Sequence, residues 1–191
     1  MPCVIRWPGV IKPDTVYNGM AAHEDFIPTF CAAGGDPDVV DKCLKGYQVS
    51  DKTFHVHLDG YNLIPFFKGE VKESPRNEFL YWSDDGDLFA VRIKRWKMVF
   101  KENNEEGANI WRKKFTSLRA PKIFDLLADP FERGDGSLEY DKWMFDRAFL
   151  IVPSQFVVGK WLDSFKEFPV RQKPASFNLD EIMAKLSSEK N

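Results

Sequence analysis

Three aromatic and β-branched runs lie close together in the middle of the chain, and they constrain its fold more than any other feature. They are EFLYW (78–82), DLFAVRI (87–93) and WKMVF (96–100), and a fourth run, KIFDL (122–126), follows later. The first connector ends in Asp-Gly, which is typical of a hairpin turn, and the second connector is also tight. The pattern predicts a four-stranded antiparallel sheet whose neighbouring strands are consecutive in the sequence.

Helical periodicity predicts a helix that covers one side of this sheet. The stretch 155–168 has apolar residues at helical spacing, namely Phe156, Val157, Trp161, Leu162, Phe165 and Phe168. A second helix is expected within 21–35, with Pro28 in its first turn and Gly34-Gly35 as its stop. A last short helix is expected from Asn178, which has Glu181 three residues further on and so resembles a capping box.

The remaining segments carry weaker signals. Residues 3–7 (CVIRW) predict a short strand that ends at the Pro8-Gly9 turn. Residues 36–76 predict mainly loop, with short turns of helix at most, and 59–70 is the segment most favourable to one.

Charge and hydropathy exclude several classes of partner. The chain has 27 basic and 29 acidic residues, and its most basic stretch, RIKRWK (92–97), alternates with apolar residues like the solvent face of a strand. We therefore expect no nucleic-acid partner. No run approaches the ~20 apolar residues of a transmembrane helix, and no charged segment followed by an apolar run opens the chain. We expect no membrane partner, and the compartment stays open.

Cysteine and histidine usage gives no complete metal or nucleophile site. Cys3, Cys31 and Cys43 form no C-x-x-C pair, so we expect buried free thiols, with a Cys31–Cys43 disulfide as the alternative. His55 and His57 would share one face of a strand, but two ligands do not complete a metal site. We expect no metal in this chain.

The tripeptide His23-Glu24-Asp25 allows two interpretations. It could be half of an acid–base or metal site. It also stands where a helix N-terminus is expected, and acidic side chains there simply complement the helix dipole.

Four segments carry recognisable motifs in a fixed order, at residues 7–35, 57–70, 90–100 and 123–132. Together they resemble the sulfatase family of the alkaline phosphatase superfamily, in particular its bacterial arylsulfatases. WPGVIKPDTVYNGMAAHEDFIPTFCAAGG (7–35) is similar to the family's W-P-G-x-I-x-P-G segment followed by D-x-x-P-T and A-G. HLDGYNLIPFFKGE (57–70) is similar to D-G-x-x-L-x-P-x-L-x-G. AVRIKRWKMVF (90–100) resembles A-V-R-x-x-x-W-K, and IFDLLADPFE (123–132) resembles L-Y-D-L-x-x-D-P-x-E. Asp14 stands where the family has Gly.

The resemblance implies an α+β fold that corresponds to the C-terminal portion of a sulfatase. Residues 1–76 would be a remnant of the large α/β domain, with its strand and helix, and residues 77–191 the C-terminal antiparallel sheet with its helices. Family members use calcium and a formylglycine made from a C/S-x-P-x-R motif. That motif is absent from this sequence, and the family's metal ligands precede W-P-G. We therefore expect no catalytic residue, no cofactor in this chain, and no sulfatase activity by this chain alone.

The resemblance places four residues at the rim of a substrate site in the full enzyme, where a sulfate ester would bind: His23, Asp25, His57 and Tyr61. A structural interpretation competes with this one, because Asp25 and Asp59 could simply cap a helix and a turn. The isolated chain would expose Val4, Ile5 and Trp7, and we expect it to self-associate through them.

Two other functions fit the same residues. The chain could be a freestanding binding or interaction module that reuses the sulfatase subdomain. It could also be a piece of a related phosphodiesterase or phosphonate hydrolase.

Overall fold

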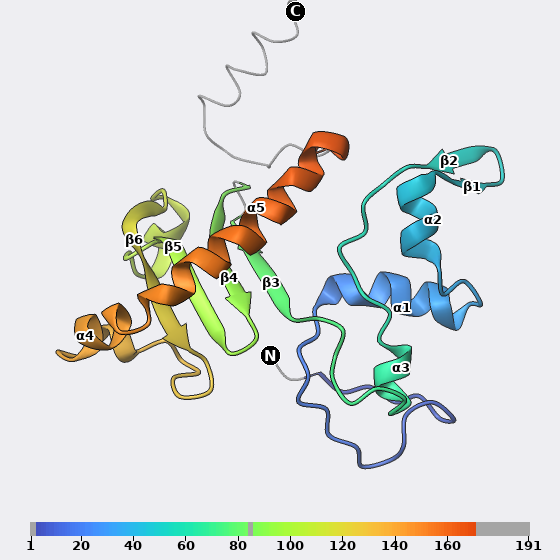
Figure 1. Cartoon of the computed structure of the whole chain (residues 1–191), viewed down its shortest axis with the longest axis horizontal. Helices are drawn as coiled ribbons and strands as arrows, with labels where there is room; N and C mark the ends of the chain where they lie inside the picture. The colour runs from blue at the N-terminus through green and yellow to red at the C-terminus, as the bar shows by residue number, and fades with distance from the viewer. Residues whose placement is uncertain (1–2, 84–85, 171–191) are drawn as a thin grey trace, which may run out of the picture. The chain divides into compact units, whose positions relative to one another are not determined.

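The computed structural model describes residues 3–83 and 86–170, which divide into two compact units with the boundary between Phe79 and Leu80 (Figure 1). No helix among these residues is long and apolar enough to cross a membrane. Each unit has its own hydrophobic core, and we describe each one separately.

The first unit is mainly helix and loop. It contains a 3-10 turn η1 (His23–Asp25), the helices α1 (Phe26–Ala33), α2 (Val39–Lys45) and α3 (Ile64–Phe67), and a hairpin of β1 (Tyr47–Val49) and β2 (Lys52–Phe54). The expected helix within 21–35 is confirmed: Pro28 lies in the first turn of α1, and Gly35, at φ +96°, follows its end. The short helix expected within 59–70 is α3.

The prediction of mainly loop for 36–76 missed α2 and the β1–β2 hairpin. The hairpin turns at Ser50, a non-glycine residue at φ +56°, so its turn lacks the usual glycine signal. Cys43 in α2 accepts a hydrogen bond from the N–H of Val56, just beyond β2. Helix and hairpin therefore hold each other in place by a contact that a local pattern does not reveal.

The strand predicted for residues 3–7 is wrong. The carbonyl of Trp7 accepts hydrogen bonds from the N–H groups of Val10 and Ile11, so this backbone closes a turn instead of joining a ladder. No described strand pairs with the segment, and Val4 is 96% exposed. Trp7 packs against the core of the first unit, which is Leu63, Phe66 and Phe67. An apolar run becomes a strand only where a partner backbone is within reach.

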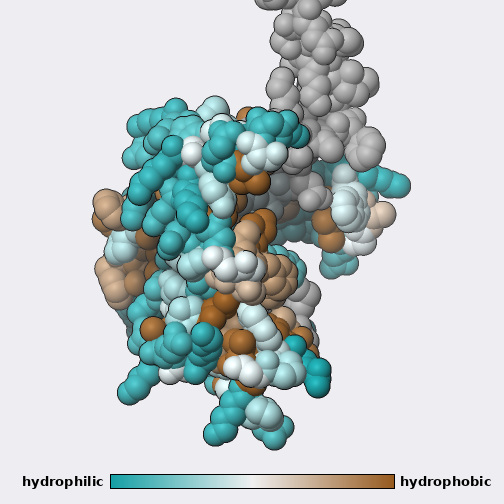
Figure 2. All heavy atoms as spheres, turned by 90° about the vertical axis from the view of Figure 1, so that its right-hand side faces the viewer, coloured by the Kyte–Doolittle hydropathy of each residue, from teal (hydrophilic) through white to brown (hydrophobic). Residues whose placement is uncertain are grey.

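Apolar side chains of the first unit also remain at its surface. Ile27 and Phe30 of α1 and Val49 and Phe54 of the hairpin are all exposed. Figure 2 views the face on the right-hand side of Figure 1, and hydrophobic residues there lie among hydrophilic ones. Exposed apolar area of this kind is typical of a surface that meets another polypeptide.

The second unit contains the predicted four-stranded antiparallel sheet. Its strands are β3 (Glu78–Trp82), β4 (Leu88–Ile93), β5 (Trp96–Glu102) and β6 (Thr116–Asp125), in that order across the sheet. Met98 of β5 lies opposite Val91 on one side and Ile123 on the other, and all three are buried. The register shifts between Val99 and Lys101, where β5 bulges against β6.

The long helix α5 (Ile151–Glu167) covers one face of this sheet, as the sequence predicts (Figure 1). The cluster of Val91, Met98 and Ile123 packs against Leu150, Ile151, Val157 and Val158. A second cluster gathers Ala90, Val99, Phe124 and Tyr140. The short helix α4 (Tyr140–Phe145) and the 3-10 turns η2 (Gly107–Trp111), η3 (Gly134–Gly136) and η4 (Ala148–Leu150) complete the unit. The helix expected from Asn178 lies outside the described residues.

Tyr140 joins helix α4 to the edge of the sheet. Its buried hydroxyl donates to the carbonyl of Ile123 and accepts from the N–H of the same residue, both at 3.0 Å. These backbone groups face away from β5, so without Tyr140 a strand edge would be left without partners.

Replacing Tyr140 with phenylalanine should lower the free energy of unfolding of the second unit by about 2 kcal/mol, because two buried backbone groups lose their partner. Urea unfolding followed by tryptophan fluorescence measures this change. Leu138→Ala is the control, because Leu138 is fully exposed and should change stability by no more than about 0.5 kcal/mol. Equal midpoints for the two variants would contradict the role given to Tyr140.

Candidate functional site

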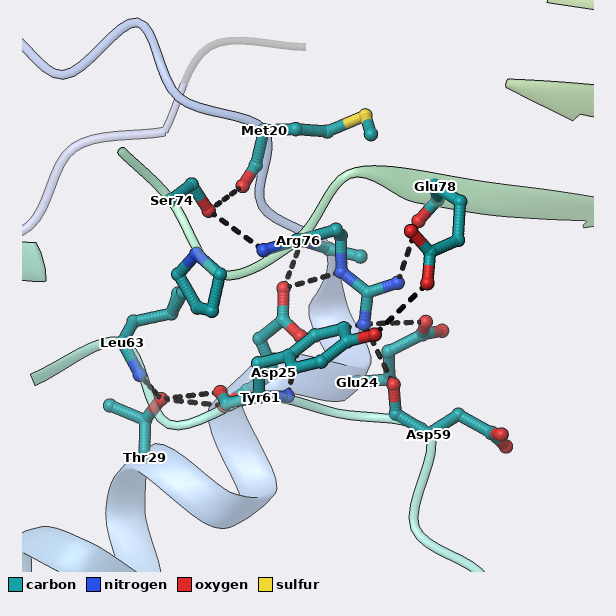
Figure 3. A network of polar contacts seen from close by, with 12 residues as sticks. Met20, Glu24, Asp25, Thr29, Asp59, Tyr61, Leu63, Ser74, Arg76 and Glu78 are labelled. Atoms are coloured by element: carbon teal, nitrogen blue, oxygen red, sulfur yellow. Dashed lines mark hydrogen bonds and ion pairs between the residues drawn. The ribbon is translucent and has the colours of Figure 1, made fainter. Parts of the chain in front are cut away.

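The first unit is organised around one buried arginine, Arg76, whose side chain is 4% exposed. Figure 3 shows its guanidinium between Asp25 and the loop that carries Asp59 and Tyr61. Nε donates to Oδ2 of Asp25 at 2.8 Å and Nη2 donates to Oδ1 at 2.6 Å, which is the bidentate geometry of a strong pair. Nη2 also donates to the carbonyl of Asp59 at 2.9 Å, and Nη1 donates to the carbonyl of Glu78 at 3.1 Å.

Asp25 is the buried partner in this pair, with 0% exposure. Besides Arg76, its carboxylate accepts hydrogen bonds from the N–H of Ala22 at 2.7 Å and from the N–H of Tyr61 at 2.8 Å. In the first of these contacts, the carboxylate of Asp25 caps the N–H group at the start of η1, as the acidic residue of a capping box does. The Tyr61 contact joins η1 to a loop 36 residues away. Asp25 is therefore a buried organiser of the first unit and does not lie at an open surface.

Two further contacts hold the same loop against α1. Thr29 donates to the carbonyl of Asp25 at 2.6 Å and accepts from the N–H of Leu63 at 3.0 Å. Gly60 lies so close that a Cβ at this position would stand 2.1 Å from the carbonyl oxygen of Glu24. Glycine is thus required here by the direct contact of two backbones.

Tyr61 lies over the guanidinium, with the Cζ of Arg76 4.9 Å from the centre of the ring. Its hydroxyl donates to Oε1 of Glu78 at 3.1 Å. Burial, followed by the charge and hydrogen bond of Glu78, raises the pKa of Tyr61 to about 12. The phenol therefore stays protonated at neutral pH and serves as a hydrogen-bond donor.

Burial raises the pKa of Glu24 above its ordinary value of 4.5, and the nearby carboxylates of Asp25 and Asp59 add to this effect, whereas Arg76 opposes it. Oε1 of Glu24 lies 2.8 Å from Nη2 of Arg76. The pKa of Arg76 is raised, because the hydrogen bonds and charges of Asp25 and Glu24 outweigh burial, which alone would lower it. The arginine is thus permanently charged.

The three histidines lie at the surface. His23 opens η1 and its ring lies 6.4 Å from that of Phe26. His55 and His57 lie in the loop after β2 rather than on a strand, and Nδ1 of His57 is 3.0 Å from Oδ1 of Asp59. Among residues 3–83 and 86–170, no group of three or more His, Cys, Asp or Glu side chains could hold a metal ion.

The structure brings two of the four predicted rim residues together and leaves the other two apart. Asp25 and Tyr61 meet at Arg76, whereas His23 and His57 lie outside this contact set. Arg76 itself, the centre of the arrangement, was not predicted as a site residue. No sequence pattern singled it out, because its main partner Asp25 is 51 residues away.

The three cysteines are free thiols, so the alternative of a Cys31–Cys43 disulfide is not what the structure contains. Cys43 is buried as expected, Cys31 is partly exposed, and Cys3 is exposed against expectation. Burial raises the pKa of Cys43, with a smaller contribution from the neighbouring Cys31 thiol. A thiol with a raised pKa is a poor nucleophile.

The comparisons with known proteins point to sulfatases. Human arylsulfatase A is 28% identical over 142 residues, covering 69% of this chain and 25% of that protein. Mouse steryl-sulfatase is 29% identical over 149 residues, covering 70% and 22%. A crystal structure of the PsFucS1 sulfatase from Pseudoalteromonas sp. superimposes with a TM-score of 0.60 at 23% identity, covering 87% of this chain and 30% of that one.

These findings confirm the resemblance to sulfatases and the mixed α and β fold. The chain spans less than a third of the length of each of these relatives, so the matches describe a portion of those proteins. No family model matches the chain.

Replacing Asp25 with asparagine should destabilise the first unit by about 3 kcal/mol, because it leaves a buried guanidinium without its main counter-charge. The measurement is the urea midpoint at which the buried Cys43 thiol becomes open to alkylation, read by peptide mass spectrometry. Glu70→Gln is the control, because the Lys68–Glu70 pair of the same unit is exposed and should contribute no more than about 1 kcal/mol. A midpoint unchanged from wild type would show that the pair does not organise this unit.

The raised pKa of Glu24 predicts a stability that depends on pH. A raised pKa means that the folded chain binds the proton more tightly than the unfolded chain, so this contribution is complete below pH 4.5 and is lost as pH rises through the folded-state pKa. Glu24→Gln should therefore match wild type near pH 4 and be more stable than wild type at pH 7. The same alkylation assay at both pH values tests this, and a Gln variant that is less stable at pH 7 would refute it.

Proposed function

We propose that this chain is the C-terminal portion of an arylsulfatase-like sulfuric ester hydrolase. The observation that carries the proposal is the agreement of two independent comparisons. Sequence similarity to arylsulfatase A and steryl-sulfatase extends over about 70% of the chain, and the fold matches 87% of the chain to part of a sulfatase.

The proposed role of this portion is to shape and support the site, with the reacting groups supplied elsewhere. Covalent sulfuryl transfer needs an activated nucleophile, and the sequence holds no C/S-x-P-x-R motif from which formylglycine could be made. The buried carboxylate of Asp25 is neutralised by Arg76, with Glu24 beside it, so this cluster does not fit a calcium ion. We derive no reaction step through a metal in this chain.

Within the proposed enzyme, we assign His23, His57 and Tyr61 to the substrate-side rim. His23 and His57 are exposed, and the imidazole of His57 is held by Asp59, so it could contact an anionic ester group. Asp25 acts on this rim indirectly, because it fixes the backbone of Tyr61. The isolated chain is also proposed to self-associate through Val4 and Ile5. Trp7, the third residue proposed for this self-association, also packs against the core of the first unit.

The purified chain should not hydrolyse 4-nitrophenyl sulfate, whereas a polypeptide from the same gene that also includes the preceding coding sequence should do so. Release of 4-nitrophenol measures both. Far-UV circular dichroism of the chain provides the control, since a folded but inactive chain separates missing chemistry from misfolding.

Turnover by the chain alone would overturn the assignment of the reacting groups to another part of the enzyme. A longer polypeptide that cleaves 4-nitrophenyl phenylphosphonate and spares the sulfate would favour the related phosphonate hydrolases. The absence of any longer product of the gene would favour a freestanding binding module.

A further inference from the structure

A cavity of about 230 Å³ lies in the second unit, between the end of β6 and helix α4. Its walls come from within the segments 123–129 and 134–143, and it opens to solvent at Ala128 and Glu139, which are both exposed. A protein cavity of about 150 Å³ is known to hold benzene. The cavity therefore has room for one aromatic ring with a short substituent.

Two contacts fix the walls of this cavity relative to each other. The hydroxyl of Tyr140 binds both backbone groups of Ile123. Oδ2 of Asp129 accepts a hydrogen bond from the N–H of Gly134 at 2.7 Å, which joins the same two segments at a second point. The cavity is thus formed before a ligand arrives, and a preformed site loses less conformational entropy when it binds.

Aromatic rings form one part of the cavity wall. Phe124, Tyr140 and Trp143 all line it, and their ring centres follow one another at distances of 5.9 and 6.0 Å. Phe124 and Tyr140 are buried, whereas Trp143 is partly covered by Arg147, whose Cζ lies 4.2 Å from a ring centre of Trp143. Such a wall packs favourably against a planar ring in a stacked or edge-to-face geometry.

Carboxylates form another part of the wall, at Asp125, Asp129 and Glu139, and none of the described residues that line the cavity is a lysine or an arginine. Arg95 neutralises the charge of Asp125. Hydrogen bonds from the backbone N–H groups of residues 133 and 134 lower the pKa of Asp129, so this carboxylate is ionised at neutral pH. The exposed carboxylate of Glu139 adds a further negative charge at the opening. The cavity therefore favours a cationic ligand over an anionic one.

We propose that this cavity binds a small arylalkylammonium compound, which carries one aromatic ring and a protonated amine on a short chain. The ring packs against Phe124 and Tyr140, and the ammonium group lies at the opening, beside Asp129 and Glu139. The two parts of such a ligand match the two kinds of wall, since the rings select its apolar part and the carboxylates select its charge. The proposal concerns the second unit alone, so it does not depend on the sulfatase assignment.

Calorimetric titration of the 191-residue chain at pH 7 with three ligands of similar shape tests the proposal first. 2-Phenylethylamine, which is protonated at this pH, should bind with a Kd below about 1 mM, a reachable value for a ligand of this size. The neutral 2-phenylethanol should bind at least about tenfold more weakly, and the anion phenylacetate more weakly still. Equal affinities for the amine and the alcohol would overturn the proposal, and so would the absence of saturable binding by the amine.

Glu139→Gln tests the role of the charge at the opening. The change keeps the size of the side chain, and an exposed position tolerates it. Binding of the amine should weaken at least about fivefold, whereas binding of the alcohol should stay within about twofold. Asp141→Asn is the matched control, because Asp141 is exposed on the same helix α4 and does not line the cavity. Equal effects of the two variants on amine binding would overturn the proposal.

Ala128→Phe places a large side chain at the cavity and tests where the ligand binds. Binding of the amine and of the alcohol should both weaken at least about tenfold, because the new ring competes for the same space. Leu127→Phe is the control, since Leu127 is 74% exposed and does not line the cavity, and far-UV circular dichroism verifies that both variants fold. Unchanged amine binding by Ala128→Phe would show that the amine binds elsewhere and would overturn the proposal.

Discussion

The bidentate pair between Arg76 and Asp25 is the interaction on which the first unit depends. Burying a guanidinium and a carboxylate is costly, and it is tolerated only when each charge is neutralised and its hydrogen-bonding groups find partners. Here the pair joins η1, the loop at 59–61 and the start of β3, three segments with little regular structure of their own. Hydrogen bonds of these two side chains thus hold the three segments together, as backbone hydrogen bonds hold the strands of a sheet together.

The same pair explains how the predicted rim residues are placed. Asp25 fixes the backbone of Tyr61, and Arg76 lies against the ring of Tyr61. Arg76 also holds the carbonyl of Asp59, whose side chain contacts His57. Asp25 is thus a member of the buried pair, Tyr61 takes its position directly from the pair, and His57 takes its position indirectly. His23 is set by the 3-10 turn in which it lies.

The second unit could be predicted from the sequence far better than the first. Its first three strands follow one another through short connectors, so local patterns determine most of its elements and their order. In the first unit, the contacts that determine the fold join residues that are far apart in the sequence. Arg76 and Asp25 are 51 positions apart, and no periodicity links them. The same limit explains the wrong strand at 3–7, because a run of apolar residues does not say whether a partner strand is present.

The central claim is that this chain is a portion of a larger sulfatase-like enzyme, and the size of the natural protein tests it most directly. An immunoblot of cells that make the protein, with an antibody raised against residues 120–170, reports that size. We predict a band well above the 22.1 kDa of this chain. A single band at 22.1 kDa would contradict the claim and identify the chain as a protein that acts without the rest of a sulfatase.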